Sequence, residues 1–409
     1  MFSNELWQKS GVSTYSINQS IRFNNPDSPY MSRTPSSAGN RRTFTISFWI
    51  KRGNPATSTG QQILNAYQNS TNRFQLFFDA SVGGGATGDK LTLFNVSGGT
   101  TTSIFETTQL FRDHSAWYHF VISIDTTNAV ASERVRLYVN GSRVTDFSTQ
   151  NNPSLNYDME WNNNQSHIFG EYGGGAYHLD AYLAEIVNID GTALDPSSFG
   201  EYNDSNIWIP KDVSGLTFGS NGFHIDGRDS ADLGDDESGN GNDFTTSGLA
   251  AHDQMVGESP TNNFCTYNSI QLQSGATLSN GNLDAVSSGS SWRNVHSTIG
   301  VSSGKWYWEV KASVIDSTEA WIAGIQETSF ESKTNYWYQS GYTASSSGIV
   351  FGVLHNNNKV TNTTKTSFTH DIAQGDIVQF QLNLDDNELT VLVDGVSKGK
   401  IYDITANTE

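Results

Sequence analysis

The stretch 41-RRTFTISFWIKR-52 alternates apolar and polar side chains, and this pattern decides the fold class. Apolar residues stand at every second position from Phe44 to Ile50, with Thr45, Ser47 and Trp49 between them. Successive side chains of a β-strand point to opposite faces, so the apolar groups share one side of an extended chain. The stretch therefore predicts a β-strand with one face in a core.

Similar stretches follow in the first half of the chain. They are RFQLFFDA (73–80), KLTLFNV (90–96), AWYHFVISID (116–125), RVRLYVNGSRVTDF (134–147) and HLDAYLAEIVNID (178–190). Within the fourth stretch Asn140-Gly141 separates two alternating runs, and this dipeptide favours a type I′ hairpin turn because both residues tolerate positive φ. Several such strands with turn signals between them are typical of a β-sandwich or jelly roll.

The composition also predicts an all-β protein and excludes other classes. Charged residues make up 16% of the 409 residues, against roughly 25% in typical domains, so Ser, Thr, Asn, Gln and Gly must supply the polar surface. The net charge of −19 opposes binding to a phosphate backbone, and no nucleic acid partner is expected. No run of about 18 apolar residues occurs, so no membrane span is expected. The single cysteine, Cys265, cannot pair within the chain.

The pattern divides the chain into four regions. Residues 1–14 lack core-forming periodicity, and 15–200 carry the strands described above. Residues 201–268 are rich in Asp, Gly and Asn and are predicted to be an interdomain connector with little regular structure. Residues 269–409 are predicted to form a second β-sandwich, from GKWYWEVKAS (304–313), AWIAGIQ (320–326), SGIVFGVLH (347–355) and the strand pair within 376–404.

Three resemblances to known protein families extend these predictions. The succession TFTISFWIKR, WYHFVISID, VRLYVNGSRV and LAEIVNIDGTALDPSSF resembles the laminin G/concanavalin A-like lectin jelly roll over residues 15–200. SGKWYWEV, AWIAGI and GDIVQFQLNLDDNELTVLVDGV are similar to the SPRY domain, which implies a second sandwich that is incomplete at its C-terminus. Residues 240–268 resemble segments of virion proteins of tailed phages, particularly marine ones.

The sequence gives little support to an enzyme. Glucanases with the jelly-roll fold place paired carboxylates on one strand as Glu-x-Asp-x-x-Glu, and hydrolysis of a glycosidic bond needs such a pair. The nearest acidic strand here, residues 183–188, has only Glu185. We therefore expect a non-enzymatic protein, with a glycoside hydrolase as the less favoured alternative.

Calcium is the one cofactor that the sequence suggests. Asp236 and Asn240 lie in D-x-S-x-N-G, which copies the first half of an EF-hand loop, although position 12 is Ser247 rather than Glu. The laminin G resemblance implies that Asp79 or Asp180 could hold calcium in a loop. For Asp236 and Asn240 the alternative is a solvated Asx turn.

Two aromatic stretches are candidate carbohydrate sites, because sugar recognition uses exposed rings together with amides and carboxylates. Residues 157–164 contribute Trp161 and Asn163, and residues 171–178 form a Gly-rich loop. The candidates in that loop are Tyr172, Tyr177 and His178. Two alternatives remain open for these aromatic rings: they could pack against another subunit, or they could pack within the domain.

Aromatic residues elsewhere suggest protein partners. Phe2, Leu6 and Trp7 could anchor the N-terminal arm to a particle, because the arm has no core of its own. In the second domain the partner-binding candidates are Tyr336, Trp337, Tyr338 and Tyr342.

Together these features predict a virion surface protein, assembled in the host cytoplasm and released by lysis. We expect a fibre or receptor-binding component that engages a host surface glycan, contacts other virion proteins and forms a homo-oligomer. A capsid decoration or tail structural protein is the alternative.

Overall fold

The computed structural model describes residues 15–54, 60–79, 89–173, 175–270, 272–287, 293–315, 321–326, 350–361 and 364–403. The chain divides into two compact units. Unit 1 comprises Met1–Ile270 with Leu278–Ala285, and unit 2 comprises Gln271–Thr277 with Val286–Glu409. Within the described ranges the helices are three-residue 3-10 turns, and none is long and apolar enough to cross a membrane. The all-β prediction is confirmed.

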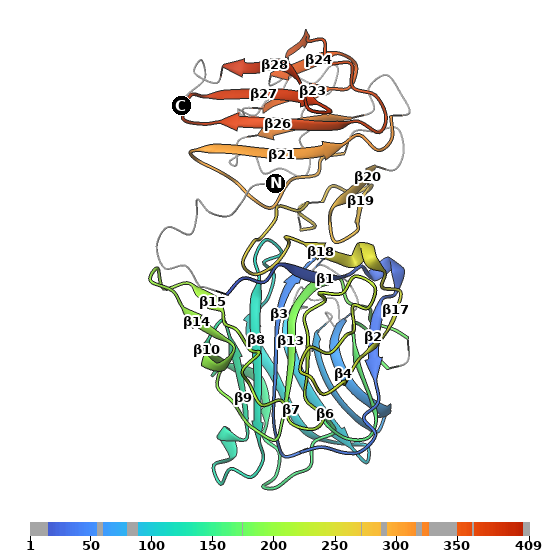
Figure 1. Cartoon of the computed structure of the whole chain (residues 1–409), viewed down its shortest axis with the longest axis vertical. Coiled ribbons are helices and arrows are strands. Elements are labelled where there is room, and N and C mark those ends of the chain that lie inside the picture. Colours follow the sequence, from blue (N-terminus) through green and yellow to red (C-terminus); the bar gives the residue numbers. More distant parts are fainter. Residues whose placement is uncertain are drawn as a thin grey trace. The chain divides into compact units, whose positions relative to one another are not determined.

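Unit 1 is built on two antiparallel sheets that face each other across one core (Figure 1). Sheet A has the order β10-β9-β8-β3-β13-β1-β18, with β16 also paired to β13. Its strands are β1 (Gln19–Phe23), β3 (Thr43–Arg52), β8 (Tyr118–Asp125), β9 (Val135–Val139), β10 (Ser142–Arg143), β13 (Ala181–Asp190), β16 (Phe223–Ile225) and β18 (Gln254–Val256).

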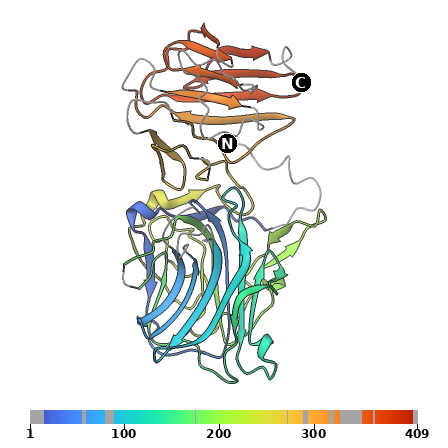
Figure 2. The same cartoon turned by 180° about the vertical axis from the view of Figure 1, so that it is seen from behind.

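Sheet B has the order β11-β7-β6-β5-β4-β12-β2-β17. Figure 2 shows its strands β4 to β7, in blue to cyan, side by side. The strands are β2 (Tyr30–Arg33), β4 (Gln61–Asn69), β5 (Asn72–Phe78), β6 (Lys90–Ser97), β7 (Thr100–Leu110), β11 (Phe147–Asn151), β12 (Ser166–Phe169) and β17 (Thr245–Ser247).

The stretch that opened the sequence analysis is a central strand of sheet A. β3 lies between β8 and β13, and its side chains Phe44, Ile46, Phe48 and Ile50 are fully buried in the core between the sheets. Trp49, on the opposite face, is also buried, with only 4% of its surface exposed. The outer face of sheet A is therefore covered as well.

Most of the cover comes from residues that follow the last long strand. One apolar cluster joins Val121, Tyr138 and Val187 of sheet A to Phe199 and Phe218. A second cluster includes the outward-facing Trp49 and Tyr182, with Trp208 and Met255 packed against it. Apolar side chains on the outer face of a sheet must be removed from water, and the chain after residue 194 does this together with Ile17 and Trp117.

This arrangement corrects the predicted interdomain connector. Residues 201–268 lie in unit 1, where they supply β14 (Gly200–Tyr202), β15 (Trp208–Pro210), β16, β17 and β18. β17 and β18 each add an edge strand, to sheets B and A. The residues that suggested a linker form turns, because short Asp and Asn side chains bond nearby backbone groups and Gly tolerates positive φ.

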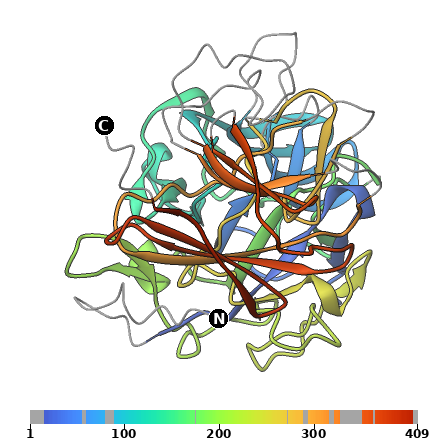
Figure 3. The same cartoon turned by 90° about the horizontal axis from the view of Figure 1, so that it is seen from above.

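Unit 2 is a second β-sandwich, as predicted. Its two four-stranded sheets have the orders β21-β26-β27-β28 and β22-β23-β24-β25 (Figure 3, orange to red). Phe351 of β23 and Phe380 of β26 lie in one apolar cluster, so the two sheets share a core. The strands are β21 (Lys305–Lys311), β22 (Ile322–Gln326), β23 (Val350–Leu354), β24 (Asn358–Thr361), β25 (Thr364–Ser367), β26 (Ile377–Asn383), β27 (Glu388–Val393) and β28 (Val396–Asp403). A short hairpin, β19 (Ala276–Ser279) and β20 (Asp284–Ser287), contains two of the three unit boundaries along the chain, and the first boundary follows Ile270.

Candidate functional site

Among the described residues, no apolar cluster covers the outer face of sheet B as the two clusters cover that of sheet A. Along β5 the side chains of Phe74, Leu76 and Phe78 enter the core, so Gln75 and Phe77 point the other way. The register pairs Gln75 with Phe94 of β6, and Phe94 with Ile104 of β7. Phe77, Phe94 and Ile104 are partly exposed. This sheet therefore presents apolar side chains to solvent.

Polar side chains between these rings are held in fixed positions. The guanidinium carbon of Arg73 lies 5.3 Å from the centre of the Phe94 ring, a cation–π distance. Arg73 Nε donates to Gln75 Oε1 at 2.7 Å, and Gln75 Nε2 donates to Gln62 Oε1 at 3.0 Å. We call Tyr67, Arg73, Gln75, Phe77 and Phe94 the aromatic face.

The predicted 171–178 loop packs beside the aromatic face. Asn65 Nδ2 donates to the Glu171 carbonyl at 2.6 Å, and Gln62 N donates to the Tyr177 carbonyl at 2.8 Å. The ring of Tyr172 lies 5.1 Å from that of Tyr67 and 6.1 Å from that of Tyr177, edge to face in both cases. Of the carbohydrate candidates, Tyr172 and Tyr177 thus adjoin one surface.

Tyr177 is the most solvent-accessible of these tyrosines. Tyr177 is 52% exposed, and its backbone φ is 58°. Positive φ is uncommon for a residue with a bulky side chain and marks a strained position. The bond from Gln62 to the Tyr177 carbonyl helps to hold that conformation, which leaves the ring in solvent.

The other carbohydrate candidates lie elsewhere or are less accessible. Trp161 is fully buried, its Nε1 donates to Asn188 Oδ1 at 2.9 Å, and its ring contacts Phe74. The structure thus corrects Trp161 from a ligand residue to a core residue, since a buried ring cannot stack on a sugar. Asn163 is partly exposed and its Nδ2 donates to Glu160 Oε2 at 3.2 Å.

His178 belongs to the 171–178 loop but makes a weak contact there. Its Nδ1 lies 3.7 Å from Glu171 Oε2, which is longer than a hydrogen bond. Burial lowers the pKa of His178 and raises that of Glu171. Burial therefore favours the uncharged form of both groups.

Asp236 and Asn240 hold the chain in a turn. Asp236 Oδ1 accepts the backbone N–H groups of His224 and Ser238 at 2.8 and 2.9 Å, and Oδ2 accepts that of Asn242 at 2.8 Å. Asn240 Nδ2 donates to the Gly219 and Gly222 carbonyls. These bonds match the Asx-turn alternative rather than a calcium loop.

The remaining calcium candidates are on strand ends. Asp180 Oδ1 is buried and accepts no hydrogen bond, and burial raises the pKa of Asp180 to about 6 although Arg52 opposes this. Asp79 follows β5, and residues 80–88 after it lie outside the described ranges. Over the described ranges no three His, Cys, Asp or Glu side chains are grouped to hold a metal ion. These residues alone do not fit a calcium site, and calcium at Asp79 and Asp180 stays a prediction.

The candidate partner residues are not described by the structure. Phe2, Leu6 and Trp7 lie in residues 1–14, outside the described ranges. The same holds for Tyr336, Trp337, Tyr338 and Tyr342. Their roles stay predictions.

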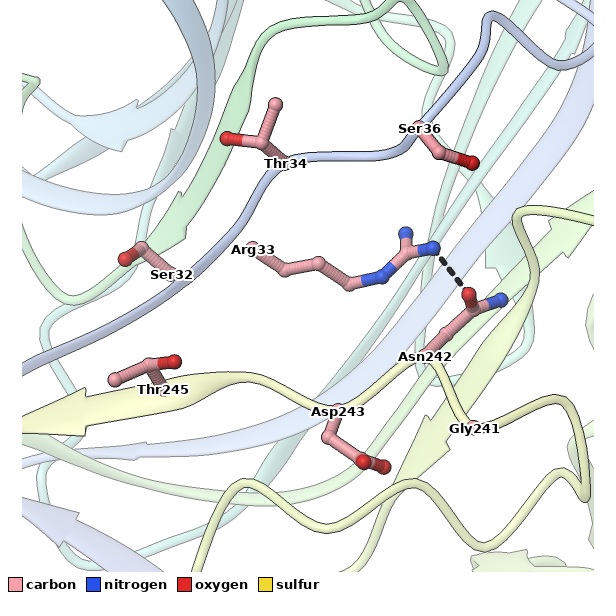
Figure 4. A pocket seen from close by; sticks show the side chains of 8 residues that line it. All are labelled: Ser32, Arg33, Thr34, Ser36, Gly241, Asn242, Asp243 and Thr245. Atoms are coloured by element: carbon pink, nitrogen blue, oxygen red, sulfur yellow. Dashed lines mark hydrogen bonds between the residues drawn. The ribbon is translucent and has the colours of Figure 1, made fainter.

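Sequence reasoning missed a polar pocket of about 540 Å³ in unit 1. It lies where the end of β2 meets the chain that leads into β17, and Figure 4 shows the Arg33 side chain extending across it. The lining residues are Ser32, Arg33, Thr34, Ser36, Gly241, Asn242, Asp243 and Thr245. No sequence signal joins positions 33 and 242, because the pairing of β2 with β17 is what brings them together.

A second missed pocket, of about 500 Å³, lies beside the β14–β15 hairpin. Trp208 and Tyr202 line it with Asp195, Glu201 and Lys211. Trp208 Nε1 donates to His119 Nδ1 at 3.0 Å, and the rings of Tyr202 and Trp208 are 4.9 Å apart. Glu201, Tyr202, Trp208 and Lys211 fall in residues 201–268, which were predicted to be a connector, so no pocket was expected there.

Comparisons with known proteins agree with this fold. Residues 26–197 match the model of the concanavalin A-like lectin/glucanases superfamily. No curated protein matches the chain in sequence. This part of unit 1 therefore has a lectin-like jelly-roll fold.

Several solved structures are similar at low identity. A putative carbohydrate binding protein from Bacteroides ovatus is 16% identical, with 58% of this chain and 60% of that chain covered and a TM-score of 0.40. Domains LG4-5 of the mouse laminin alpha1 chain are 11% identical, with 97% and 82% covered and a TM-score of 0.34. A native heptameric SAP-like pentraxin from Limulus polyphemus is 14% identical, with 44% and 80% covered and a TM-score of 0.32.

Proposed function

We propose that the chain is a non-enzymatic carbohydrate-binding protein and that a glycan binds on the aromatic face. One observation carries the proposal. The outer face of sheet A is covered by the chain's own apolar residues, whereas sheet B leaves Tyr67, Phe77 and Phe94 partly exposed on its outer face. Exposed aromatic side chains grouped on one surface mark an interaction site.

The residues of the aromatic face suit a sugar. A pyranose ring has an apolar C–H face that packs on an aromatic ring, and its hydroxyls need donors and acceptors nearby. Arg73 lies beside Phe94, and its guanidinium has donors besides the Nε–H that goes to Gln75. The hydroxyl of the partly exposed Tyr67 can both donate and accept. The rings of Tyr172 and Tyr177 would extend the surface for a longer chain.

The acidic residue on the candidate catalytic strand supports binding rather than hydrolysis. Glu185 is only 6% exposed, and its Oε2 lies 2.8 Å from His224 Nε2. Burial alone lowers the pKa of His224, but the bond to Glu185 and the negative charges of Glu185, Asp226 and Asp236 together outweigh burial, and the pKa is raised. Glu185 therefore serves as the buried partner of His224, whereas a glycosidase needs two carboxylates beside the scissile bond.

The setting that we propose is the surface of a virion, where the chain would act in host attachment or, as the alternative, in decoration of the capsid. This part rests on the sequence resemblance of residues 240–268 to phage virion segments. The SPRY-like assignment of unit 2 rests on sequence resemblance as well. Electron microscopy of virions with an antibody to residues 290–404 tests the setting, because absence of label from the particle would contradict it.

Binding to immobilised polysaccharides tests the carbohydrate function. We expect Phe94→Ala to weaken binding at least tenfold, because the substitution removes the partly exposed ring against which Arg73 packs. Phe264→Ala is the matched control, because Phe264 is 42% exposed and its ring is not part of this surface. If a glycan array detects no ligand for the wild-type chain, or if both variants bind equally, the aromatic face is not a glycan site.

A further inference from the structure

We propose that the Arg33 pocket is a separate binding site for an acidic sugar, one that carries a carboxylate beside hydroxyl groups. The sugar character of this ligand rests on the proposed function. The site itself does not, because its residues lie on β2, on the segment after β2 and on the segment leading into β17, apart from the aromatic face.

The walls of the pocket are fixed by hydrogen bonds from outside it. Asn164 Nδ2 donates to the Ser36 carbonyl at 3.0 Å, which ties down one wall. On the other wall, Asn242 Nδ2 donates to the Ser220 and Gly222 carbonyls at 3.0 and 2.7 Å. With both amide hydrogens engaged, Asn242 must present its Oδ1, and Arg33 Nη2 donates to it (Figure 4). The guanidinium is thus positioned before any ligand arrives.

Arg33 is a cation without an ionic partner. Among the described residues no carboxylate lies within ion-pair distance of it, and its single hydrogen bond goes to the neutral amide of Asn242. Partial burial lowers the pKa of Arg33, with Asp236 and Asp243 acting in the opposite direction. A guanidinium stays protonated in proteins and has five donors in a planar fork that matches a carboxylate. Arg33 therefore has donors to offer to an anion.

The other lining groups select hydroxyls. Figure 4 shows Thr34 and Ser36 on one side of the Arg33 side chain, with Asp243 and Thr245 on the other. Hydroxyls both donate and accept, and the Asp243 carboxylate accepts. A pocket of about 540 Å³ is large enough for a small ligand, since such sites span roughly 300–1,000 Å³. Its lining is polar, which suits a hydroxyl-rich ligand rather than an apolar one.

Asp243 also argues for a single negative charge on the ligand. Its carboxylate lines the pocket and repels anions, and this repulsion grows with the charge of the ligand. A carboxylate carries one charge and is held by the guanidinium in a bidentate manner. A sugar acid satisfies both sides, with its carboxylate on Arg33 and a hydroxyl on Asp243. Hexuronic acids and sialic acids share this chemistry.

Calorimetric titration of the full chain tests the site with four probes: glucuronic acid, N-acetylneuraminic acid, glucose and acetate. We expect at least one of the two sugar acids to bind tenfold or more tighter than glucose and acetate. The acid that binds shows whether the ligand is a hexuronic acid or a sialic acid. Arg33→Gln should lower that affinity about tenfold or more, as expected for loss of a hydrogen bond to a charged group. Arg33→Lys should recover part of it, because a point charge remains.

Two further variants make the test specific. Asp243→Asn keeps an oxygen that accepts the Asp236 N–H but removes the repelling charge, so we expect equal or tighter binding of the acid. Phe94→Ala should leave the acid affinity unchanged while it weakens polysaccharide binding. Unchanged melting temperatures show that each variant is folded.

The possible failures can be told apart. If the acids bind no tighter than glucose or acetate, or if Arg33→Gln binds as well as the wild type, the acidic-sugar site is wrong while binding on the aromatic face can persist. A glutamate-rich peptide that competes as well as the acids would contradict the sugar class. If Phe94→Ala loses polysaccharide binding and Arg33→Gln loses no binding to the acids, the proposed glycan site on the aromatic face is supported and the acidic-sugar site is contradicted.

Discussion

At the scale of single residues, His119 of unit 1 has a structural role that its contacts define. Its ring stacks on Trp49 with a centroid distance of 4.5 Å and lies 5.9 Å from the Trp208 ring. Trp208 Nε1 can only donate, so His119 Nδ1 accepts and the remaining N–H, on Nε2, points to Ser47 Oγ at 2.9 Å. The bonds therefore select the neutral tautomer, and burial lowers the pKa of His119 to about 3.

The buried imidazole predicts a loss of stability in acid. In the unfolded chain a histidine binds a proton near pH 6.5, whereas His119 in the folded chain stays neutral until about pH 3. Between these values the unfolded state binds more protons, so the free energy of unfolding falls as the pH falls, by up to about 1.4 kcal/mol per pH unit.

Urea unfolding at pH 7.5 and pH 4.5 measures this contribution. We expect His119→Gln to be less stable than the wild type at pH 7.5, because it disturbs the stack with Trp49 and Trp208. The difference should narrow at pH 4.5, since glutamine does not titrate. A constant difference at the two pH values would contradict a neutral buried histidine.

At the scale of elements, two hairpin turns have the same backbone but different surroundings. Asn140 and Gly141 have φ of 47° and 78°, and Asp394 and Gly395 have 47° and 79°, so both pairs adopt the positive φ that Asn-Gly and Asp-Gly dipeptides favour. A Cβ on Gly141 would lie 2.5 Å from the ring of Trp208, whereas a Cβ on Gly395 would meet nothing within 4 Å.

This difference predicts unequal costs for the same substitution. Gly395→Ala should cost about 1–2 kcal/mol, the penalty of a left-handed conformation for a residue with a Cβ. Gly141→Ala should cost that and about 1–3 kcal/mol more, because the methyl group overpacks against Trp208. Thermal unfolding of both variants shows which one loses more stability. Equal decreases in melting temperature would show that the Trp208 ring moves aside without a loss of stability.

At the scale of the whole molecule, the most consequential feature is the cover on sheet A. Tyr138, Val187 and Ile189 belong to sheet A, and their cluster partners Phe199 and Phe218 follow the last long strand. Removal of the cover would expose apolar area at a cost of roughly 25 cal/mol per Å². The jelly roll therefore depends on the segment that the sequence analysis assigned to a connector.

Two fragments test this dependence. We expect residues 1–285 to fold alone with a cooperative thermal transition, because they contain both sheets and the cover of unit 1. Residues 1–200 should be insoluble or lack a cooperative transition, since they lack β16, β17, β18 and Phe218. A soluble, cooperatively folded 1–200 fragment would show that the cover is dispensable.

Much of the fold could be predicted from the sequence because it follows from local alternation. The stretch 41–52 forms the β-strand that its pattern predicts, with one face in the core, and the turn at Asn140-Gly141 has the predicted conformation. The candidate site was predicted less well. Tyr172 and Tyr177 adjoin an exposed surface, but Trp161, with the same local composition around it, is in the core. Local composition does not say which ring is covered by distant residues.

The sequence by itself determined the all-β class and two β-sandwiches, because period-2 patterns and turn dipeptides act between neighbours in the chain. The lectin-like character of the first sandwich was implied by its resemblance to the laminin G/concanavalin A-like family. Only the tertiary structure decided that residues 201–268 cover sheet A, that Phe94 faces solvent, and that Arg33 meets Asn242. Each of these depends on contacts between residues far apart in sequence. Such contacts are set by which surfaces must be buried together, and no local pattern records that.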